Sequence, residues 1–289
     1  MTQRDPAHPT DPPAAAPAPA PAYQPYVPPP STVPQAVMLP LGLADPLRWL
    51  GKGARDFMAA PGIGIFYGVC FWLMAALLTL VFRNKPEYAM SIASGCLLVG
   101  PFLAMGLYEV SRRREQGLRP GLGASLTCWD KHIRSMAMLV LVLIVLELLW
   151  GRASLVVFAV FFNTGMPSTT GVLQAIFNPE NIEFVLGYLA VGGLFALLVY
   201  STAVVSIPMI LDRDTDAISA AITSIRVMFA NPITMLWWGF LITLLIALGL
   251  ATWGLGLVLV GPLLGHASWH AYRGAVDWLE PAAVPASHS

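Results

Sequence analysis

The segment LVGPLLGHASWHAYR, residues Leu259–Arg273, is echoed earlier in the chain by LVGPFLAMGLYEVSR, residues Leu98–Arg112. A second echo aligns without a gap, between RDFMAAPGIGIFYG at Arg55–Gly68 and RVMFANPITMLWWG at Arg226–Gly239. These two segments share an Arg, an Ala, a Pro, an aromatic pair and a Gly at matching positions. The Arg55 and Arg226 segments mark the start of a repeated unit, and the two LVGP segments mark its end. Apolar sequence lies between the start and the end of each copy. The sequence therefore predicts a repeated membrane architecture.

The composition indicates an integral membrane protein. Of the 289 residues, 56% are hydrophobic and only 11% are charged, whereas a soluble domain carries about 25% charged residues. We therefore expect the chain to contact a lipid bilayer. Acidic and basic residues balance to a formal net charge of zero, so the charge gives no indication of a nucleic-acid partner. Cys70, Cys96 and Cys128 lack the paired spacing of a metal or redox motif.

The two ends of the chain are expected to be disordered. Residues 1–40 are rich in Pro and Ala and have no apolar periodicity, which predicts a disordered cytoplasmic tail. This tail lacks the features of a cleavable signal peptide, so the first membrane helix is expected to direct insertion. Its prolines, with Tyr23 and Tyr26, leave open either a spacer or a polyproline-II ligand. A second disordered tail is expected at residues 280–289, and the membrane domain at residues 41–279.

Six membrane-spanning helices are predicted, because one crossing of the hydrocarbon needs about 20 mostly apolar residues. The apolar runs are Ile63–Phe82, Ile92–Val110, Met136–Phe162, Phe184–Leu211 and Ile233–Tyr272. The last run is about twice the length of one crossing, and a break at Ala251–Gly256 divides it into a hairpin. All but three of the sixteen Lys and Arg residues fall on one side of this topology. The positive-inside rule then places both termini in the cytoplasm.

The predicted fold is an all-α bundle of six transmembrane helices in three two-helix pseudo-repeats, with amphipathic helices on the cytoplasmic face. The third unit is fainter. It would run from a helix near Leu126–Arg134, through an enlarged external loop at Asn163–Glu183, to Pro208. A further amphipathic helix at the membrane interface is predicted by Ile218, Ile222, Ile225 and Phe229.

Five prolines mark the ends and interiors of the predicted spans. Pro61 and Pro232 lie where a helix can begin, and Asn231 is expected to cap the second of these helices. Inside spans lie Pro101, Pro208 and Pro262. Each of these removes a backbone hydrogen bond and predicts a helix kink, which a membrane tolerates where other groups satisfy the freed carbonyl.

Three motifs connect the chain to a known family: GHASWHAYR at Gly265–Arg273, SIPMILDRDTDA at Ser206–Ala217 and the start RDFMAAPG at Arg55–Gly62. Through them the chain resembles an uncharacterised family of bacterial integral membrane proteins, whose members are sometimes labelled cytochrome c oxidases. The resemblance spans roughly residues 43–278, and it implies a membrane fold without an established activity. The oxidase label would imply histidines on several helices, because a haem–copper oxidase core needs them to hold its haems and copper.

His266 and His270 are the first candidate site, because two histidines four apart share one helix face and can bind one metal. Glu109, the repeat equivalent of His270, could supply a third ligand. The alternatives are an interfacial belt with helix-to-helix hydrogen bonds, and a role in protonation. Because few histidines lie in or near the predicted spans, we expect no haem or metal cofactor.

Glu147 and Arg152 are the second candidate site, because ionisable groups at membrane depth are costly and often functional. They are five residues apart and do not share a helix face, so each is expected to need a partner on another helix or a water-filled cavity. A transport or proton path is one interpretation. The other is a structural pair, or a position at the outer interface.

No nucleophile elbow, Walker loop or Gly-rich dinucleotide turn occurs in the sequence, so we expect a protein that is not an enzyme. The favoured function is an accessory or assembly component of a membrane complex, possible partners including a respiratory complex. A permease-like transporter with a cavity between repeats is the first alternative. A metal- or haem-binding protein that uses His266 and His270 is the second.

Overall fold

The structure is a computed structural model that describes residues 35–85, 88–161 and 182–279. Residues 1–34 of the N-terminal tail predicted at 1–40, the tail predicted at 280–289, and nearly all of the external loop predicted at Asn163–Glu183 lie outside the described residues.

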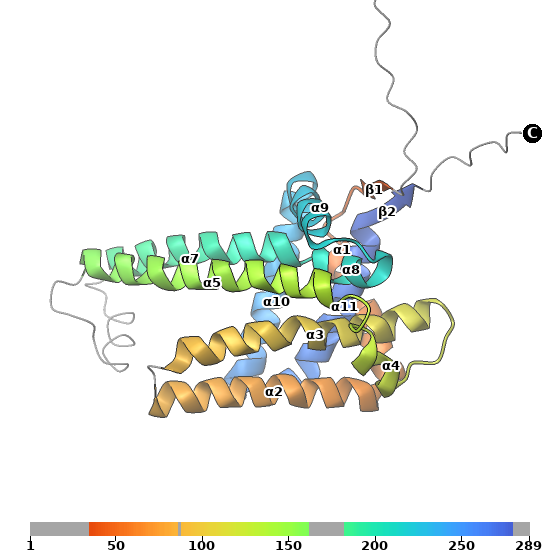
Figure 1. The fold of residues 1–289 in the computed structure, drawn as a ribbon, viewed down its shortest axis with the longest axis horizontal. Helices are drawn as coiled ribbons and strands as arrows, with labels where there is room; N and C mark the ends of the chain where they lie inside the picture. The colour runs from red at the N-terminus through yellow and green to blue at the C-terminus, as the bar shows by residue number, and fades with distance from the viewer. Residues whose placement is uncertain (1–34, 86–87, 162–181, 280–289) are drawn as a thin grey trace, which may run out of the picture. The chain divides into compact units, whose positions relative to one another are not determined.

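Five described helical segments are long and apolar enough to cross a membrane. They are α2 (Pro61–Asn84), α3 (Ala89–Glu115), α5 (Ile133–Phe161), α7 (Ile182–Ala203) continued by α8 (Ser206–Arg213), and α10 (Pro232–Ala251). These segments match the first five predicted spans. In Figure 1, α2 lies beside α3 and α5 lies beside α7. Large apolar side chains such as Leu80, Leu141 and Leu189 are exposed on them, as lipid-facing residues are. The protein is an all-α, multi-pass membrane protein.

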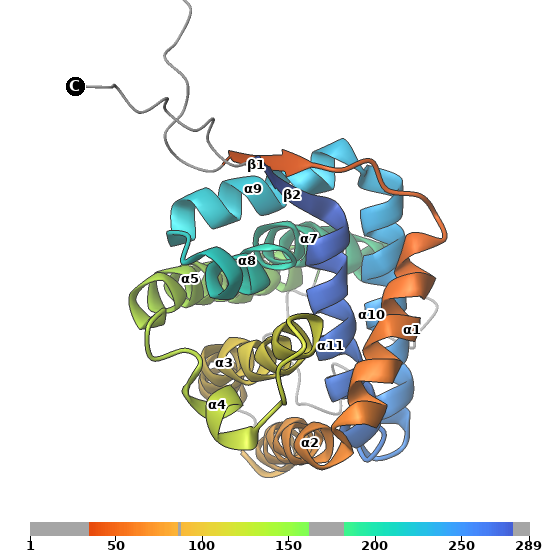
Figure 2. The same cartoon turned by 90° about the vertical axis from the view of Figure 1, so that its right-hand side faces the viewer.

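The long apolar run at the C-terminal end forms the predicted hairpin. Helix α10 ends at Ala251, and α11 (Leu257–Ala275) begins after a five-residue turn. The predicted break at Ala251–Gly256 is thus confirmed. Helix α11 is not among the five candidate spans, because its second half carries polar residues. It packs instead against α1 (Asp45–Ala59), α2, α3 and α10, and Figure 2 shows it between α1, α3 and α10.

Glycines bring α1 and α2 unusually close to α11. A Cβ added to Gly53 of α1 would lie 2.7 Å from the backbone nitrogen of Ala267. A Cβ added to Gly68 of α2 would lie 2.0 Å from the carbonyl oxygen of Val258. Pro262 has no N–H to donate to that same carbonyl, so the neighbouring helix covers a backbone group that α11 cannot satisfy itself. Small residues at helix contacts are a common device in membrane proteins.

Two helix junctions have nearly the same backbone geometry. Ala60, between α1 and α2, has φ −138° and ψ 57°. Asn231, between α9 (Ala217–Ala230) and α10, has φ −134° and ψ 54°. Pro61 and Pro232 follow at the first position of the next helix, as predicted, where a proline loses no helical hydrogen bond. These two junctions are the ones whose sequences align.

The predicted capping role of Asn231 is wrong, since its side chain makes no cap hydrogen bond to α10. Its oxygen accepts from the Leu41 amide at 2.9 Å, and its amide nitrogen donates to the Leu39 carbonyl at 3.0 Å. It thus holds the segment that follows β1 (Gln35–Met38). Strand β1 pairs antiparallel with β2 (Val276–Leu279). Gln35–Met38 therefore belongs to the ordered unit, although the sequence analysis places it in the tail.

The fourth predicted span is broken rather than kinked near Pro208. Helix α7 ends at Ala203, and α8 begins at Ser206 after a turn. A proline ring clashes with the carbonyl four residues earlier, here Val204, which places the break in that turn. The Val205 amide donates to the Ser224 hydroxyl of α9 at 3.2 Å, so the broken helix is satisfied by its neighbour. Pro101 and Pro262 lie inside continuous helices.

Helix α9 is amphipathic, as its isoleucines predict. Ile218, Ile222 and Phe229 are exposed, whereas Thr223 and Ser224 are buried against the other helices. The carboxylate of Asp216 caps the helix by accepting from the Ser219 amide at 2.9 Å. The buried face also carries Ala220, Val227 and Met228, so apolar residues lie on the outer face as well as the inner one, as expected of a helix that contacts lipid. The remaining short helix, α4 (Leu122–Thr127), is followed by turns, and the helix predicted near Leu126–Arg134 is not continuous.

Candidate functional site

The two histidines of α11 are held by different helices. His270 donates from Nε2 to Asp56 of α1 at 2.8 Å, and Asp56 also pairs with Arg114 of α3. His266 is fully buried, and its Nδ1 lies 2.8 Å from the Ser111 hydroxyl of α3. The cluster of Asp56, Ser111, Arg114, His266 and His270 therefore fastens α1 and α3 to α11.

Asp56 is ionised in this cluster at neutral pH. Burial raises the pKa of its carboxyl group, but hydrogen bonds from His270 and Ser111 and the charges of His270 and Arg114 outweigh that effect. The net result is a pKa below the ordinary value of 3.8. A buried carboxylate that keeps its charge in this way forms a structural ion pair with Arg114, and its removal leaves Arg114 and His270 without their acceptor.

Glu109 does not join the histidines as the metal hypothesis requires. Its carboxylate accepts from Arg112 at 2.8 Å and from Arg113 at 3.0 Å, both on its own helix. Among residues 35–85, 88–161 and 182–279, no group of three or more His, Cys, Asp and Glu side chains is arranged to hold a metal ion. His266 Nε2 is buried without a hydrogen-bond partner in the described structure. The histidines thus lie in a helix-to-helix network.

A second polar network lies beside the first one. Tyr272 donates to Asp212 at 2.7 Å, and Arg273 donates to Glu115 at 3.2 Å, which also accepts from Trp269 at 3.0 Å. A polar pocket of about 450 Å³ opens here, lined by Arg112, Glu115, Gln116, Asp212, Arg213, Trp269 and Arg273. Because α3 and α8 both end here, the pocket marks the polar end of two candidate spans.

Glu147 lies near the middle of α5 and borders an apolar pocket of about 290 Å³ between α3, α5 and α7. One carboxylate oxygen, Oε2, accepts from the Ser94 hydroxyl of α3 at 2.7 Å. The other, Oε1, is buried and has no hydrogen-bond partner in the described part of the chain. The other lining residues are Leu97, Leu146, Trp150, Gly192, Phe195, Ala196 and Val199. A carboxylate thus faces an apolar space within the predicted membrane core.

Arg152 is not part of this pocket. Its side chain is exposed on α5, and it does not line the cavity that Glu147 borders. This placement agrees with the prediction that Glu147 and Arg152 do not form an ion pair with each other. The structure brings Glu147 to Ser94 on another helix, as an ionisable group at that depth requires.

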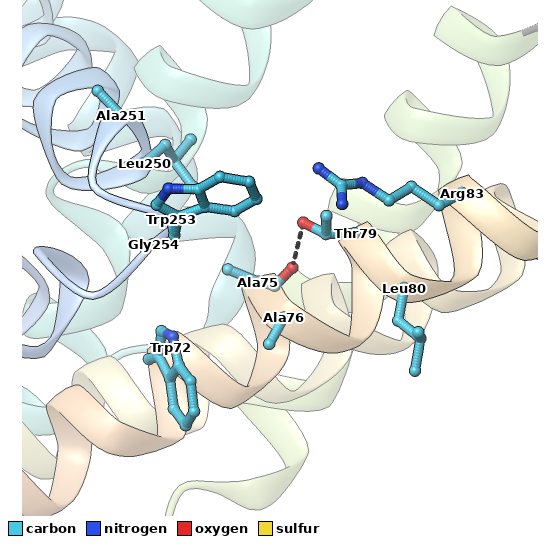
Figure 3. A pocket seen from close by; sticks show the side chains of 10 residues that line it. All are labelled: Trp72, Ala75, Ala76, Thr79, Leu80, Arg83, Leu250, Ala251, Trp253 and Gly254. Atoms are coloured by element: carbon cyan, nitrogen blue, oxygen red, sulfur yellow. Dashed lines mark hydrogen bonds between the residues drawn. The ribbon is translucent and has the colours of Figure 1, made fainter.

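A third pocket lies at the opposite end of α2 from Pro61. Its volume is about 400 Å³, and it is formed by α2 and by the turn between α10 and α11. Figure 3 shows Trp253 and Arg83 pointing toward each other, with Ala75, Ala76 and Thr79 on α2 below them. The Arg83 guanidinium lies 5.6 Å from the centre of the Trp253 ring, a cation–π distance.

Sequence reasoning missed Asp56, Ser94 and Ser111. Asp56 lies in the aligned segment RDFMAAPG, but its repeat counterpart is Val227, so the alignment itself gave no signal for a charge. Helical periodicity does place Asp56 on the same helix face as Lys52, one turn earlier, and Trp49, two turns earlier. The serines are common in membrane helices and carry no motif.

The comparisons with known proteins support a membrane protein. Residues 89–212 match the family described as "Predicted integral membrane protein (DUF2189)". No curated protein and no solved structure matches the chain. The matched residues contain α3, α5, α7 and α8, and with them every residue that lines the Glu147 pocket. Over residues 89–212 the chain is thus similar to a family of predicted integral membrane proteins whose function is unknown.

Proposed function

We propose that this protein is a permease-like membrane protein, not an enzyme, which binds small organic cations in the pocket around Glu147. The observation that carries the proposal is the buried, unpartnered Oε1 atom of Glu147 in an otherwise apolar cavity. The Ser94 hydroxyl satisfies only Oε2, so Oε1 is left as a buried acceptor that a bound cation would satisfy.

The pocket favours a cation over a neutral ligand for a second reason. Pro101 has no N–H to donate to the carbonyl of Leu97, and Leu97 is one of the lining residues. The Leu97 carbonyl therefore lacks its usual helical donor four residues later, and it adds an acceptor to the Glu147 carboxylate among the residues that line this pocket. The aromatic rings of Trp150 and Phe195 border the same cavity, and aromatic faces attract ammonium ions. A volume of about 290 Å³ fits a ligand with one small apolar group.

Uptake into proteoliposomes tests this function. Radiolabelled benzyltrimethylammonium, a quaternary ion that cannot lose its charge, should enter vesicles that contain the wild-type protein. We expect Glu147→Gln to reduce the rate at least about tenfold, because the amide keeps the shape but removes the counter-charge.

Glu183→Gln is the matched control, since Glu183 is an exposed carboxylate at the start of α7 and does not line the pocket. Uptake should remain at the wild-type rate in this variant. If the wild type and Glu147→Gln transported equally, or if neither exceeded empty vesicles, the permease proposal would be wrong.

We also propose that α11 is a sixth span, so that the chain forms two-helix units in a bacterial inner membrane with both termini in the cytoplasm. With 19 residues, α11 is about 28 Å long, close to the thickness of the hydrocarbon. Its polar residues are bound by α1 and α3, which is how membrane helices accommodate polar side chains. The matching junctions at Ala60 and Asn231 support the repeat.

A reporter fused after Ser289 measures this topology. We expect alkaline phosphatase to be inactive and a fluorescent protein to fluoresce at that position, because six spans return the chain to the cytoplasm. Fusions after Ala251 should give the opposite pattern, since α10 ends there. Phosphatase activity after Ser289 would mean that α11 does not cross the membrane.

The accessory role in a membrane complex predicted from the sequence stays a second hypothesis. It rests on the N-terminal tail, on the short external loops and on the oxidase label given to some members of the family. Co-purification of a stoichiometric complex from native membranes would favour it over the permease.

A further inference from the structure

We propose that the pocket between α2 and the α10–α11 turn binds one anionic phospholipid, with its phosphate on Arg83 and an acyl chain along α2. This site is independent of the Glu147 pocket and lies outside the residues that match the family.

The position of Arg83 fits a lipid headgroup. Arg83 is the penultimate residue of α2, about 33 Å along the helix axis from Pro61. Because the hydrocarbon core is about 30 Å thick, the guanidinium reaches the level of the phosphates. Among the described residues, Arg83 pairs with no carboxylate, and its guanidinium lies over the Trp253 ring. Lys85 adds a second exposed cation next to it.

The pocket is polar at its mouth and apolar along its wall. Arg83 provides donors at the end of α2, where the Thr79 hydroxyl already donates to the Ala75 carbonyl at 2.8 Å, while Ala75 and Ala76 leave room one turn earlier. Trp72, Leu80 and Leu250 supply apolar surface. A volume of about 400 Å³ accommodates a headgroup and the first part of one chain rather than a free phosphate ion.

The turn holds Trp253 in an unusual conformation. Trp253 has φ 58°, in the left-handed region that bulky residues rarely adopt, and it is 81% exposed. Gly254, at φ 77°, rests on α2, where an added Cβ would lie 3.5 Å from the Trp72 ring. The strained backbone thus presents an exposed indole to the arginine, and such strain is retained where a site uses it. Indole rings prefer the headgroup level of a bilayer.

Native mass spectrometry of the purified full-length protein in detergent tests the site, with dioctanoyl phosphatidylglycerol as the probe. We expect the wild type to retain one lipid and Arg83→Gln to bind it about tenfold more weakly. Arg55→Gln, which changes an exposed arginine of α1 outside the pocket, should bind like the wild type. Equal binding by wild type and Arg83→Gln would overturn the proposal.

Two further variants separate lipid binding from folding. Ala76→Leu should fill the groove and weaken lipid binding, although it leaves the charge unchanged. Trp253→Asn should weaken binding without lowering the melting temperature, because asparagine tolerates the left-handed conformation. Inorganic phosphate or dioctanoyl phosphatidylcholine that bound as well as the anionic lipid would contradict the proposed ligand.

Discussion

Gly68→Ala is expected to lower the stability of the protein by about 2 kcal/mol or more, because the new methyl group overpacks the contact between α2 and α11. The added Cβ would lie 2.0 Å from the Val258 carbonyl oxygen, and a backbone atom cannot move aside as a flexible side chain can. The two helices must separate, which also uncovers the carbonyl that Pro262 leaves without a donor. The apparent melting temperature in detergent measures the effect.

Gly62→Ala provides the control on the same helix. Nothing lies within 4 Å of a Cβ built at Gly62, so alanine there should be neutral or slightly stabilising through its helix propensity. A Gly68→Ala variant as stable as Gly62→Ala would show that α2 and α11 do not approach each other as described.

Asp56→Asn is expected to cost roughly 3 kcal/mol, since it leaves Arg114 and His270 beside a neutral amide in a largely buried cluster. The loss should appear as release of α1, measured as faster hydrogen exchange over Asp45–Ala59. Asp130→Asn, at an exposed carboxylate before α5, should leave both the melting temperature and the exchange of α1 unchanged.

The pH dependence of stability gives an independent check on Asp56. Because its pKa is lowered from 3.8 in the folded state, its contribution is present above that value and is lost as the pH falls through the folded pKa. The difference in melting temperature between the wild type and Asp56→Asn should therefore shrink between about pH 5 and about pH 3. A difference that stayed constant over this range would contradict the role of the charge.

The sequence predicts much of the fold for physical reasons. Apolar runs longer than one crossing predict the membrane helices, and prolines at Pro61 and Pro232 mark where two of them begin. A break in the last run follows from its length, since about 40 apolar residues are too many for one span. Its position at Ala251–Gly256 follows from the glycines there and from Trp253 at the expected depth of the membrane interface. Helical periodicity predicts α9 and its exposed isoleucines.

The partners of polar side chains could not be predicted in the same way. Periodicity tells which face of a helix is apolar, but not which helix meets that face. Asn231 looked like a helix cap, yet it binds the segment after β1, about 190 residues earlier in the chain. His270 was expected near Glu109, but it meets Asp56 because glycines let α1 pack closely on α11.

The most direct test of the proposed function is a calorimetric titration of the purified protein with benzyltrimethylammonium. The described pocket predicts one saturable binding event for the wild type and for Glu183→Gln, with binding lost in Glu147→Gln. Binding that is unchanged in Glu147→Gln, or absent from the wild type, would contradict the assignment of this carboxylate as a cation site.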